Sequence, residues 1–259
     1  MKIPFLDYLQ QRPTTAAFPT VQKLLSMGQK TPTNPFTGTV IGFHTTDQTY
    51  TREAERLRRC LDLLALPHEI RPVESLGGWV RNAAQKPTII QEMRAQYSGP
   101  LLYVDVDAVF HQNPWNYLGE YQNVDIAFYR TPEGELLSGT LLLNDTPGAA
   151  EIVERWVAAC ASAPEEWDQV ILDKVLQKNP EEFRISTIPA SFCWIFDCKN
   201  QSTVDIVIEH LQASREGRER KFGFIVPNRL RRRRNRIEEI ERILFSEASR
   251  AESAPDRSR

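Results

Sequence analysis

The chain has 259 residues, of which 41% are hydrophobic and 25% are charged, with a formal net charge of −2. This length fits one large domain or one domain with an appendage, and the apolar fraction excludes a disordered chain. No apolar run approaches the about 18–20 residues that cross a bilayer, and the four cysteines form no CxxC pattern, so we expect a cytoplasmic protein with reduced thiols and no transmembrane segment.

The first predicted elements form a strand–helix–strand unit. Residues 1–38 hold five prolines and no sustained periodicity, so we expect an irregular lead-in with a short helix near 16–27. The apolar, β-branched run at 39–45 predicts a buried strand, the helical spacing of apolar residues in 51–66 predicts a helix, and 68–73 predicts a second strand. The short links between them indicate a right-handed βαβ unit.

Helices and strands continue to alternate through the rest of the body. Pro87 suits the first turn of a helix over 86–97, and LLYVDVDAVF at 101–110 predicts the next strand. We predict further strands at 123–130, 135–144, 183–190 and 203–210, and helices beginning at Pro147 and covering 168–177. This alternation indicates an α/β fold with a mostly parallel central sheet flanked by helices.

The C-terminal part carries the opposite charge from the body. Residues 1–210 contain 18 Lys/Arg and 26 Asp/Glu, whereas residues 211–259 contain 14 and 8. Ten of these basic residues lie in 211–236, including four consecutive arginines at 231–234. We expect a basic helix over 230–244 with a disordered end. The cluster suits nucleic acid or an anionic membrane surface, and the alternative is a solvated charge run.

The feature most indicative of chemistry is a pair of aspartates, Asp105 and Asp107, at the end of an apolar strand. The two-residue period of a strand would put both carboxylates on one face. Such a pair can hold a hard divalent cation through its oxygens, at the edge of the sheet where α/β proteins bind ligands. The alternative is two solvated loop aspartates, but apolar flanks on both sides make an unpartnered acid pair costly.

Two known families have a motif with two aspartates at this spacing after an apolar strand. LLYVDVDAV fits the motif of haloacid-dehalogenase-like phosphatases, in which Asp105 would be the nucleophile, but that motif normally lies on the first core strand. The chain more closely resembles GT-A glycosyltransferases, in which a DxD follows a nucleotide-binding βαβ unit. The resemblance covers about 39–215 and includes five segments in family order: VIGFHTTDQTY, KPTIIQEMRAQYSGPLLYVDVD, LLSGTLLLN, EWDQVILDKVL and IEHLQASR.

The resemblance implies a set of site residues with assigned roles. Asp105, Asp107 and His210 would ligate Mn²⁺ or Mg²⁺, and Asp168 and Gln169 would lie near the anomeric centre. The remaining donor-site candidates are Thr45, Thr46, Tyr50, Lys86, Arg94, Asp105, Ser138, Gly139, Ser214 and Arg215. The tryptophans Trp115, Trp167 and Trp194 are candidates for an acceptor groove or for core packing.

We therefore expect a GT-A-like, Rossmann-like catalytic domain over 39–215 with a basic extension over 216–259. The implied activity is metal-dependent transfer, with a retaining-type layout, of a sugar from a nucleotide-diphosphate sugar to a saccharide or glycolipid. A hydroxymethylated base in DNA competes as acceptor because of the arginine-rich tail. Two alternatives stay open, namely a phosphatase acting through Asp105 and a non-catalytic nucleic-acid-binding protein acting through the tail.

Overall fold

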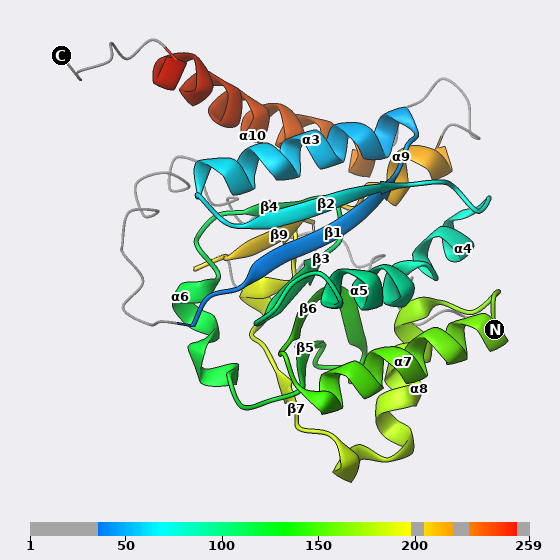
Figure 1. Cartoon of the computed structure of the whole chain (residues 1–259). Coiled ribbons are helices and arrows are strands. Elements are labelled where there is room, and N and C mark those ends of the chain that lie inside the picture. Colours follow the sequence, from blue (N-terminus) through cyan, green and yellow to red (C-terminus); the bar gives the residue numbers. More distant parts are fainter. Residues whose placement is uncertain (1–35, 198–204, 220–227, 253–259) are drawn as a thin grey trace.

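The strand–helix–strand unit at the start of the predicted body is present as β1 (Thr39–Thr45), α3 (Gln48–Leu63) and β2 (His68–Val73). β1 and β2 pair in parallel (Figure 1). Asp47 caps α3 by accepting hydrogen bonds from the backbone N–H groups of Thr49 and Tyr50, so the helix begins earlier than predicted. The computed structural model describes residues 36–197, 205–219 and 228–252, and the helix predicted near 16–27 lies outside them.

The remaining elements follow the predicted alternation. They are α4 (Trp79–Ala83), α5 (Lys86–Arg94), β3 (Leu101–Val104), β4 (Ala108–Phe110), α6 (Trp115–Leu118), β5 (Ile126–Arg130), β6 (Leu136–Leu143), α7 (Pro147–Ser162), α8 (Asp168–Lys178), β7 (Ile185–Thr187), β8 (Trp194–Ile195), β9 (Ile208–His210), α9 (Ser214–Glu219) and α10 (Asn228–Glu252). Prolines occupy the first turns of α5 and α7, as expected.

The central sheet has six strands in the order β2-β1-β3-β6-β5-β7. β1 runs parallel to both β2 and β3, and β5 runs parallel to β7, whereas β6 is antiparallel to its two neighbours. The predicted α/β fold with a mostly parallel sheet is thus confirmed. A second sheet contains β4-β9-β8.

The predicted strand over 101–110 is divided between these two sheets. β3 pairs with β1 and β6, whereas β4 pairs with β9. The prediction of one continuous strand was wrong because the N–H of Ala108 donates to the carbonyl of Asp105 and closes a tight turn. Asp105 and Asp107 therefore lie in the turn that joins the two sheets.

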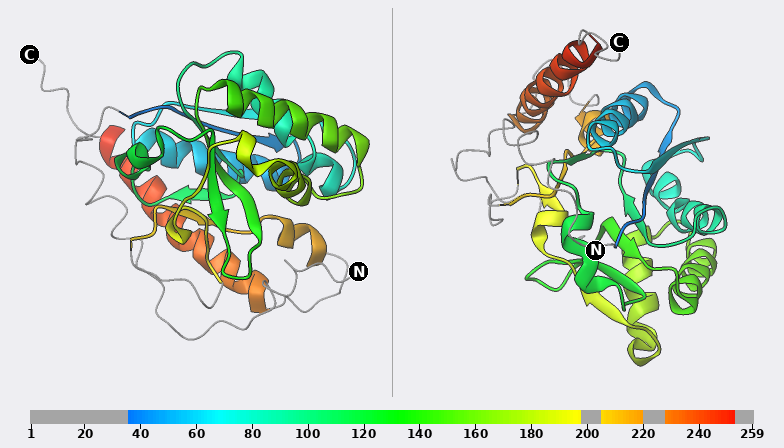
Figure 2. Two further views of the ribbon diagram at one scale, coloured as in Figure 1. Left: turned by 90° about the horizontal axis from the view of Figure 1, so that it is seen from below. Right: turned by 60° about the vertical axis from the view of Figure 1, so that its left-hand side comes forward.

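Successive side chains along each strand of the central sheet point to opposite faces, and both faces are buried. Val40, Leu102 and Leu142 face α3, β4 and β9, whereas Ile41, Tyr103 and Leu141 face α5, α7 and α8. Figure 2 shows the helices on opposite sides of the sheet. Burial on both faces is typical of sheets built from βαβ units.

α10 packs alongside α3 on the outside of the first of these layers (Figures 1 and 2). Its residues Ile240 and Leu244 belong to the same hydrophobic cluster as Leu57 and Leu61 of α3. The described part of the predicted extension therefore contributes to the main core. None of the described helices has the length and apolar composition needed to cross a membrane.

Candidate functional site

A cavity of about 170 Å³ lies at the ends of β1 and β3, where ligands bind in α/β proteins. Ten candidate residues predicted from the sequence line it: Thr45, Tyr50, Lys86, Asp105, Asp107, Ser138, Trp167, Asp168, Gln169 and Ser214. The other lining residues are Phe43, His44, Trp79, Asn82, Ala83, Tyr103, Val106 and Gln212. Residues from six separate stretches of the chain thus meet at one place: 43–50, 79–86, 103–107, 138, 167–169 and 212–214.

The aspartate pair enters the cavity from the turn after β3. The Asp105 side chain is 43% exposed, and its Oδ1 accepts a hydrogen bond of 2.9 Å from the Tyr103 hydroxyl. Asp107 is more enclosed, and its Oδ2 accepts a 2.6 Å hydrogen bond from the N–H of Ala213. Burial opposes the charge on Asp107, but contacts with His210 and with this N–H lower the pKa of the carboxyl. Both aspartates are therefore positioned by hydrogen bonds.

Lys86 joins two acidic residues that are far apart in sequence. Its Nζ lies 2.9 Å from Oδ2 of Asp168 and 3.2 Å from Oδ1 of Asp105, and it donates to the Ser138 hydroxyl at 2.9 Å. Burial disfavours the charged amine, but the two carboxylates outweigh it and raise the pKa of Lys86. We call Lys86, Asp105, Ser138 and Asp168 the front network.

Gln169 is held at both ends of its side-chain amide. Its Oε1 accepts from the N–H of Ser138 at 3.2 Å, and its Nε2 donates to Oε1 of Glu135 at 3.1 Å. Burial raises the pKa of Glu135 to about 7, although the bond from Gln169 favours the charged form. The start of α8 is thereby fixed against β6.

His210 is oriented by a threonine. The Thr140 hydroxyl donates its hydrogen to the carbonyl of Phe192 at 2.7 Å, so it accepts from Nε2–H of His210 at 2.9 Å. Nδ1 of His210 consequently faces Oδ1 of Asp107, 3.5 Å away. Burial disfavours a charged imidazole, but Cys193 and Asp107 beside it raise the pKa of His210.

Three side chains of kinds that bind divalent cations, Asp105, Asp107 and His210, lie near one another beside Gly139. A Cβ on Gly139 would lie 3.3 Å from Oδ2 of Asp105 and 3.5 Å from Nδ1 of His210, so the missing side chain leaves a space bordered by both atoms. Asp107 faces the same imidazole nitrogen. Two carboxylates and one imidazole suit Mn²⁺ or Mg²⁺. Within the described ranges, no three acidic, His or Cys side chains are already gathered as a metal-binding group.

Thr45 at the end of β1 and Tyr50 in the first turn of α3 line the cavity, whereas Thr46 does not. Thr45 is buried and donates to Oδ2 of Asp47 at 2.6 Å. Burial and the carboxylates of Asp107 and Asp47 raise the pKa of Tyr50, which keeps its hydroxyl neutral. Thr46, which we expected at the nucleotide, is exposed and does not line the cavity because the chain turns outward before α3.

Two predicted phosphate ligands lie elsewhere. Arg94 is at the C-terminal end of α5, where its Nη2 donates to the carbonyls of Tyr97 and Gly99, close to the start of β3. Arg215 is buried and forms a two-point ion pair with Asp197. Neither lines the cavity, since each guanidinium serves local backbone or a buried carboxylate. The cavity lining therefore gives no support to a phosphate-binding role for Arg94 or Arg215.

Two tryptophans form one wall at the cavity mouth. The rings of Trp79 and Trp167 meet edge to face with centroids 5.0 Å apart, and Trp79 is 38% exposed. Of the other candidate tryptophans, Trp115 and Trp194 are fully buried in the core. The wall thus belongs to Trp79 and Trp167, which come from α4 and the residue before α8.

Several lining residues were not predicted from the sequence. Tyr103 precedes Asp105 by two positions in an extended strand, and that period could have indicated its role. Trp79 and Gln212 carry no comparable local signal, because contacts distant in sequence bring them to the cavity. The same holds for Glu135, which does not line the cavity but contacts Gln169.

Comparison with known proteins indicates the family and the fold that this chain resembles. Residues 95–221 match the family model described as nucleotide-diphospho-sugar transferase. The chain resembles the structure of a glycosyltransferase involved in the glycosylation of the major capsid of PBCV-1, with 14% identity and a TM-score of 0.54, over 71% of this chain and 98% of that one. It also resembles apo-form glycosyltransferase GlyE of Streptococcus pneumoniae TIGR4, with 16% identity and a TM-score of 0.50, over 86% of this chain and 66% of that one.

No curated protein sequence matches the chain. At these identities the two structural matches show the fold, and the family model matches just under half of the chain. Together they confirm the predicted resemblance to GT-A nucleotide-diphospho-sugar glycosyltransferases.

Proposed function

We propose that this chain is a nucleotide-diphospho-sugar glycosyltransferase that takes its donor in the cavity at the ends of β1 and β3. One observation supports this assignment most. Lys86 links Asp105 of the aspartate turn to Asp168 at the start of α8, inside a cavity that also contains Asp107. Carboxylates for a cation and a carboxylate for the sugar are thereby held within one site.

Asp105, Asp107 and His210 are the proposed ligands of Mn²⁺ or Mg²⁺. When bound, the cation supplies positive charge that stabilises the leaving diphosphate. The Thr140 hydroxyl keeps Nδ1 of His210 turned toward Asp107, as an outer-shell partner of a metal-binding histidine does. The tyrosine hydroxyl of Tyr103 holds Asp105 in the same way.

Asp168 is the proposed group near the anomeric carbon. Its carboxylate is 5% exposed and lies 2.9 Å from the ammonium of Lys86, next to the cavity. A fixed negative charge there stabilises an oxocarbenium-like species. Gln169 positions this carboxylate through its two amide contacts with Ser138 and Glu135. We propose retention of configuration, following the layout implied by the sequence.

A saccharide or the sugar of a glycolipid is the acceptor that the cavity mouth supports best. The indoles of Trp79 and Trp167 offer an amphipathic wall beside Asp168 and Gln169. Aromatic side chains of this kind bind ring-shaped ligands by apolar contact while nearby polar groups fix orientation.

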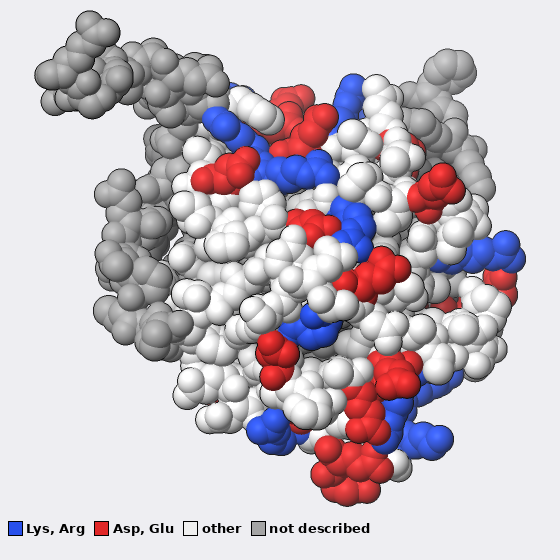
Figure 3. All heavy atoms as spheres, in the orientation of Figure 1, with Lys and Arg blue, Asp and Glu red and all other residues white. Residues whose placement is uncertain are grey.

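The arginine run gives little support to a DNA acceptor or to a nucleic-acid-binding adaptor. Four consecutive residues of a helix point in four directions, so Arg233 is buried whereas Arg231 and Arg232 are exposed. Arg234 pairs with Glu216 at 2.9 Å. On the face drawn in Figure 3, basic and acidic side chains are interspersed.

The phosphatase alternative gains no support either. Asp105 would be its nucleophile, but Oδ1 of Asp105 already contacts the ammonium of Lys86 and the hydroxyl of Tyr103. Two strands, β1 and β2, also precede β3, the strand that leads into the aspartate turn.

The test measures thermal stability with nucleoside diphosphates, with and without Mn²⁺. At a hundredfold excess over Kd, binding stabilises by about 2.7 kcal/mol, which raises the Tm of a chain of this size by about 5–10 °C. Asp107→Ala should remove the Mn²⁺-dependent part of the shift, whereas Asp62→Ala, an exposed aspartate on α3, should keep it. Donor hydrolysis and transfer that persist unchanged in Asp107→Ala with Mn²⁺ present would falsify the assignment.

A further inference from the structure

The buried face of α10 contains two arginines. Leu230, Arg233, Arg236, Ile240 and Leu244 recur every three or four positions and are all buried, with Arg233 1% and Arg236 4% exposed. This spacing puts them on one side of the helix. A buried guanidinium is costly unless its hydrogen bonds are satisfied, so the partners of these two arginines indicate what the helix face does.

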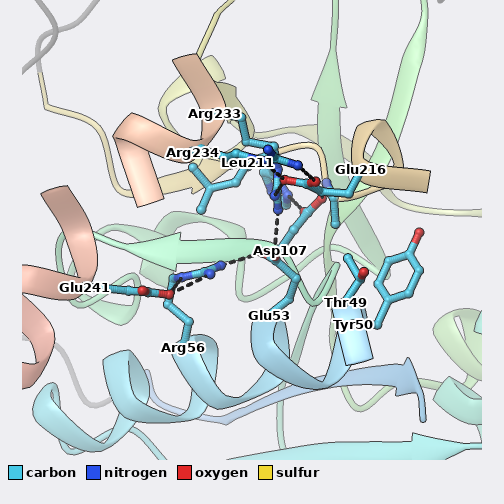
Figure 4. A network of polar contacts seen from close by, with 12 residues as sticks. Thr49, Tyr50, Glu53, Arg56, Asp107, Leu211, Glu216, Arg233, Arg234 and Glu241 are labelled. Carbon is cyan, nitrogen blue, oxygen red and sulfur yellow. Dashed lines mark hydrogen bonds and ion pairs between the residues drawn. The ribbon is translucent and has the colours of Figure 1, made fainter. Parts of the chain in front are cut away.

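Arg233 connects three separate segments, as Figure 4 shows. Its Nε donates to the carbonyl of Leu211 at 2.7 Å, its Nη1 to Glu216 of α9 at 3.1 Å, and its Nη2 to Glu53 of α3 at 2.5 Å. Glu53 is 3% exposed and also accepts from Arg56. One buried side chain therefore sets the distance between α3, α9 and the turn after β9.

Arg236 binds the strand itself. Its Nε and Nη2 donate to the two carboxylate oxygens of Glu209 at 2.9 and 2.8 Å, and Glu209 is fully buried in β9. His111 contacts the same carboxylate at 2.7 Å. Such two-point pairing fixes orientation as well as distance.

These contacts lie on both sides of His210. Glu209 precedes it and Leu211 follows it, so α10 binds the Glu209 side chain immediately before His210 and the main-chain carbonyl of Leu211 immediately after it. The same segment surrounds Asp107, because the N–H of Leu211 donates to its carbonyl at 3.1 Å and the N–H of Ala213 donates to its carboxylate. The helix thus reaches two of the three proposed cation ligands through one short stretch of backbone.

We propose that Arg233 and Arg236 are positioning residues that hold His210 and the segment 211–216 in the geometry that binds the cation and the diphosphate. This inference rests on the donor site proposed above. It gives the arginine-rich segment a structural role, in which its buried arginines support the donor site.

The chemistry of the contacts argues for positioning over packing alone. Replacing a buried ion pair with well-packed apolar residues is often neutral or stabilising, so packing does not require arginine here. A planar guanidinium that binds a main-chain carbonyl and two carboxylates specifies where those groups lie. Lysine keeps the charge but loses this fork.

The first experiment compares Arg233→Lys and Arg236→Lys with Arg232→Lys, an exposed arginine of the same run. Electron paramagnetic resonance of Mn²⁺ measures its affinity for the full chain with UDP or GDP, and hydrogen exchange measures the backbone amides of Leu211 and Ala213. We expect Mn²⁺ affinity to fall at least tenfold and both amides to exchange at least tenfold faster in the first two variants, with no change in the control.

A second variant tests the proposal if the lysine variants fail to fold. The pair Arg236→Met with Glu209→Met removes both charges, and we expect it to fold while Mn²⁺ affinity still falls at least tenfold. Wild-type affinity in this double variant, or unchanged amide exchange in the folded lysine variants, overturns the positioning role. If the wild-type chain binds no Mn²⁺ with any nucleoside diphosphate, the donor-site proposal fails, and hydrogen exchange alone decides whether the arginines position the segment.

Discussion

Two ion-pair networks lie on opposite sides of the aspartate turn, and they differ in exposure. In the front network, Lys86 and Asp168 are 5% exposed, but Asp105 is 43% exposed and borders the cavity. We call Arg233, Arg236, Glu53, Glu209 and Glu216 the rear network; its ion pairs include side chains that are only 0–4% exposed, such as Glu209 and Arg236.

This difference indicates separate tasks. A carboxylate that is partly in water can exchange a protein partner for a ligand at small cost, because solvent screens the change. Enclosed pairs cannot rearrange in this way, since an uncompensated buried charge is strongly destabilising. The front network is therefore suited to respond to substrate, and the rear network to keep the backbone in place.

Lys86→Met breaks the front network and should have the largest effect. It leaves Asp168 buried without its cation, which costs about 3–5 kcal/mol of unfolding free energy, and it should lower donor turnover at least a hundredfold. Urea denaturation and a donor-hydrolysis assay measure the two quantities.

Lys174→Met is the matched control, because Lys174 is 63% exposed and pairs with Glu166 on the surface. It should change the unfolding free energy by at most about 1 kcal/mol. Equal losses in the two variants would contradict the importance of the buried pair.

Gly139→Ala tests the space between the two networks. The added Cβ would lie 3.3 Å from Oδ2 of Asp105 and from Cε1 of His210, so these side chains must shift by a few tenths of an ångström. We expect Mn²⁺ affinity in the presence of a nucleoside diphosphate to fall about tenfold, measured by titration, with a change in unfolding free energy below about 1 kcal/mol. Unaltered affinity would show that the space is not used.

Glu135→Gln tests the edge of the front network through the pH dependence of stability. Burial raises the pKa of Glu135 from 4.5 to about 7, so between these values the folded chain binds a proton that the unfolded chain has released. The contribution of Glu135 to stability therefore falls as pH rises from about 4.5 to 7. Denaturation at several pH values should show a flatter profile for Glu135→Gln than for wild type, whereas Glu154→Gln on the exposed side of α7 should follow wild type.

Replacing Arg231 and Arg232 together with alanine should have the smallest effect. Both lie on the exposed side of the helix that carries the rear network. We expect unfolding free energy and nucleotide-dependent Mn²⁺ binding to stay within about 0.5 kcal/mol of wild type. A large loss would mean that the outward arginines also serve the site.

Much of the body could be predicted from local patterns, because β1, α3, β2, α5 and α7 depend on apolar periodicity, prolines and caps within the segment. The division of residues 101–110 between β3 and β4 could not be predicted in this way, because β4 pairs with β9 about a hundred residues later. Among site residues, Asp105, Asp107, Lys86, Asp168 and Gln169 meet as the family pattern implied, whereas Arg94 does not.

The burial of Arg233 could be predicted in part from the sequence. Leu230, Ile237, Ile240 and Leu244 mark an apolar helical stripe, and Arg233 falls within it. A basic residue inside an apolar stripe indicates a buried ion pair as readily as a nucleic-acid contact. Its acidic partners, Glu53 and Glu216, come from distant segments and could not be identified from sequence alone.

The turn that carries the aspartates has one further consequence, for folding. Asp105 follows the last residue of a strand in the six-stranded sheet, whereas Asp107 precedes β4 and His210 ends β9, both in the three-stranded sheet. A ligand held by all three residues would span the seam between two separately hydrogen-bonded sheets. When this ligand and the nucleotide donor are bound, the two sheets should unfold as a single cooperative unit.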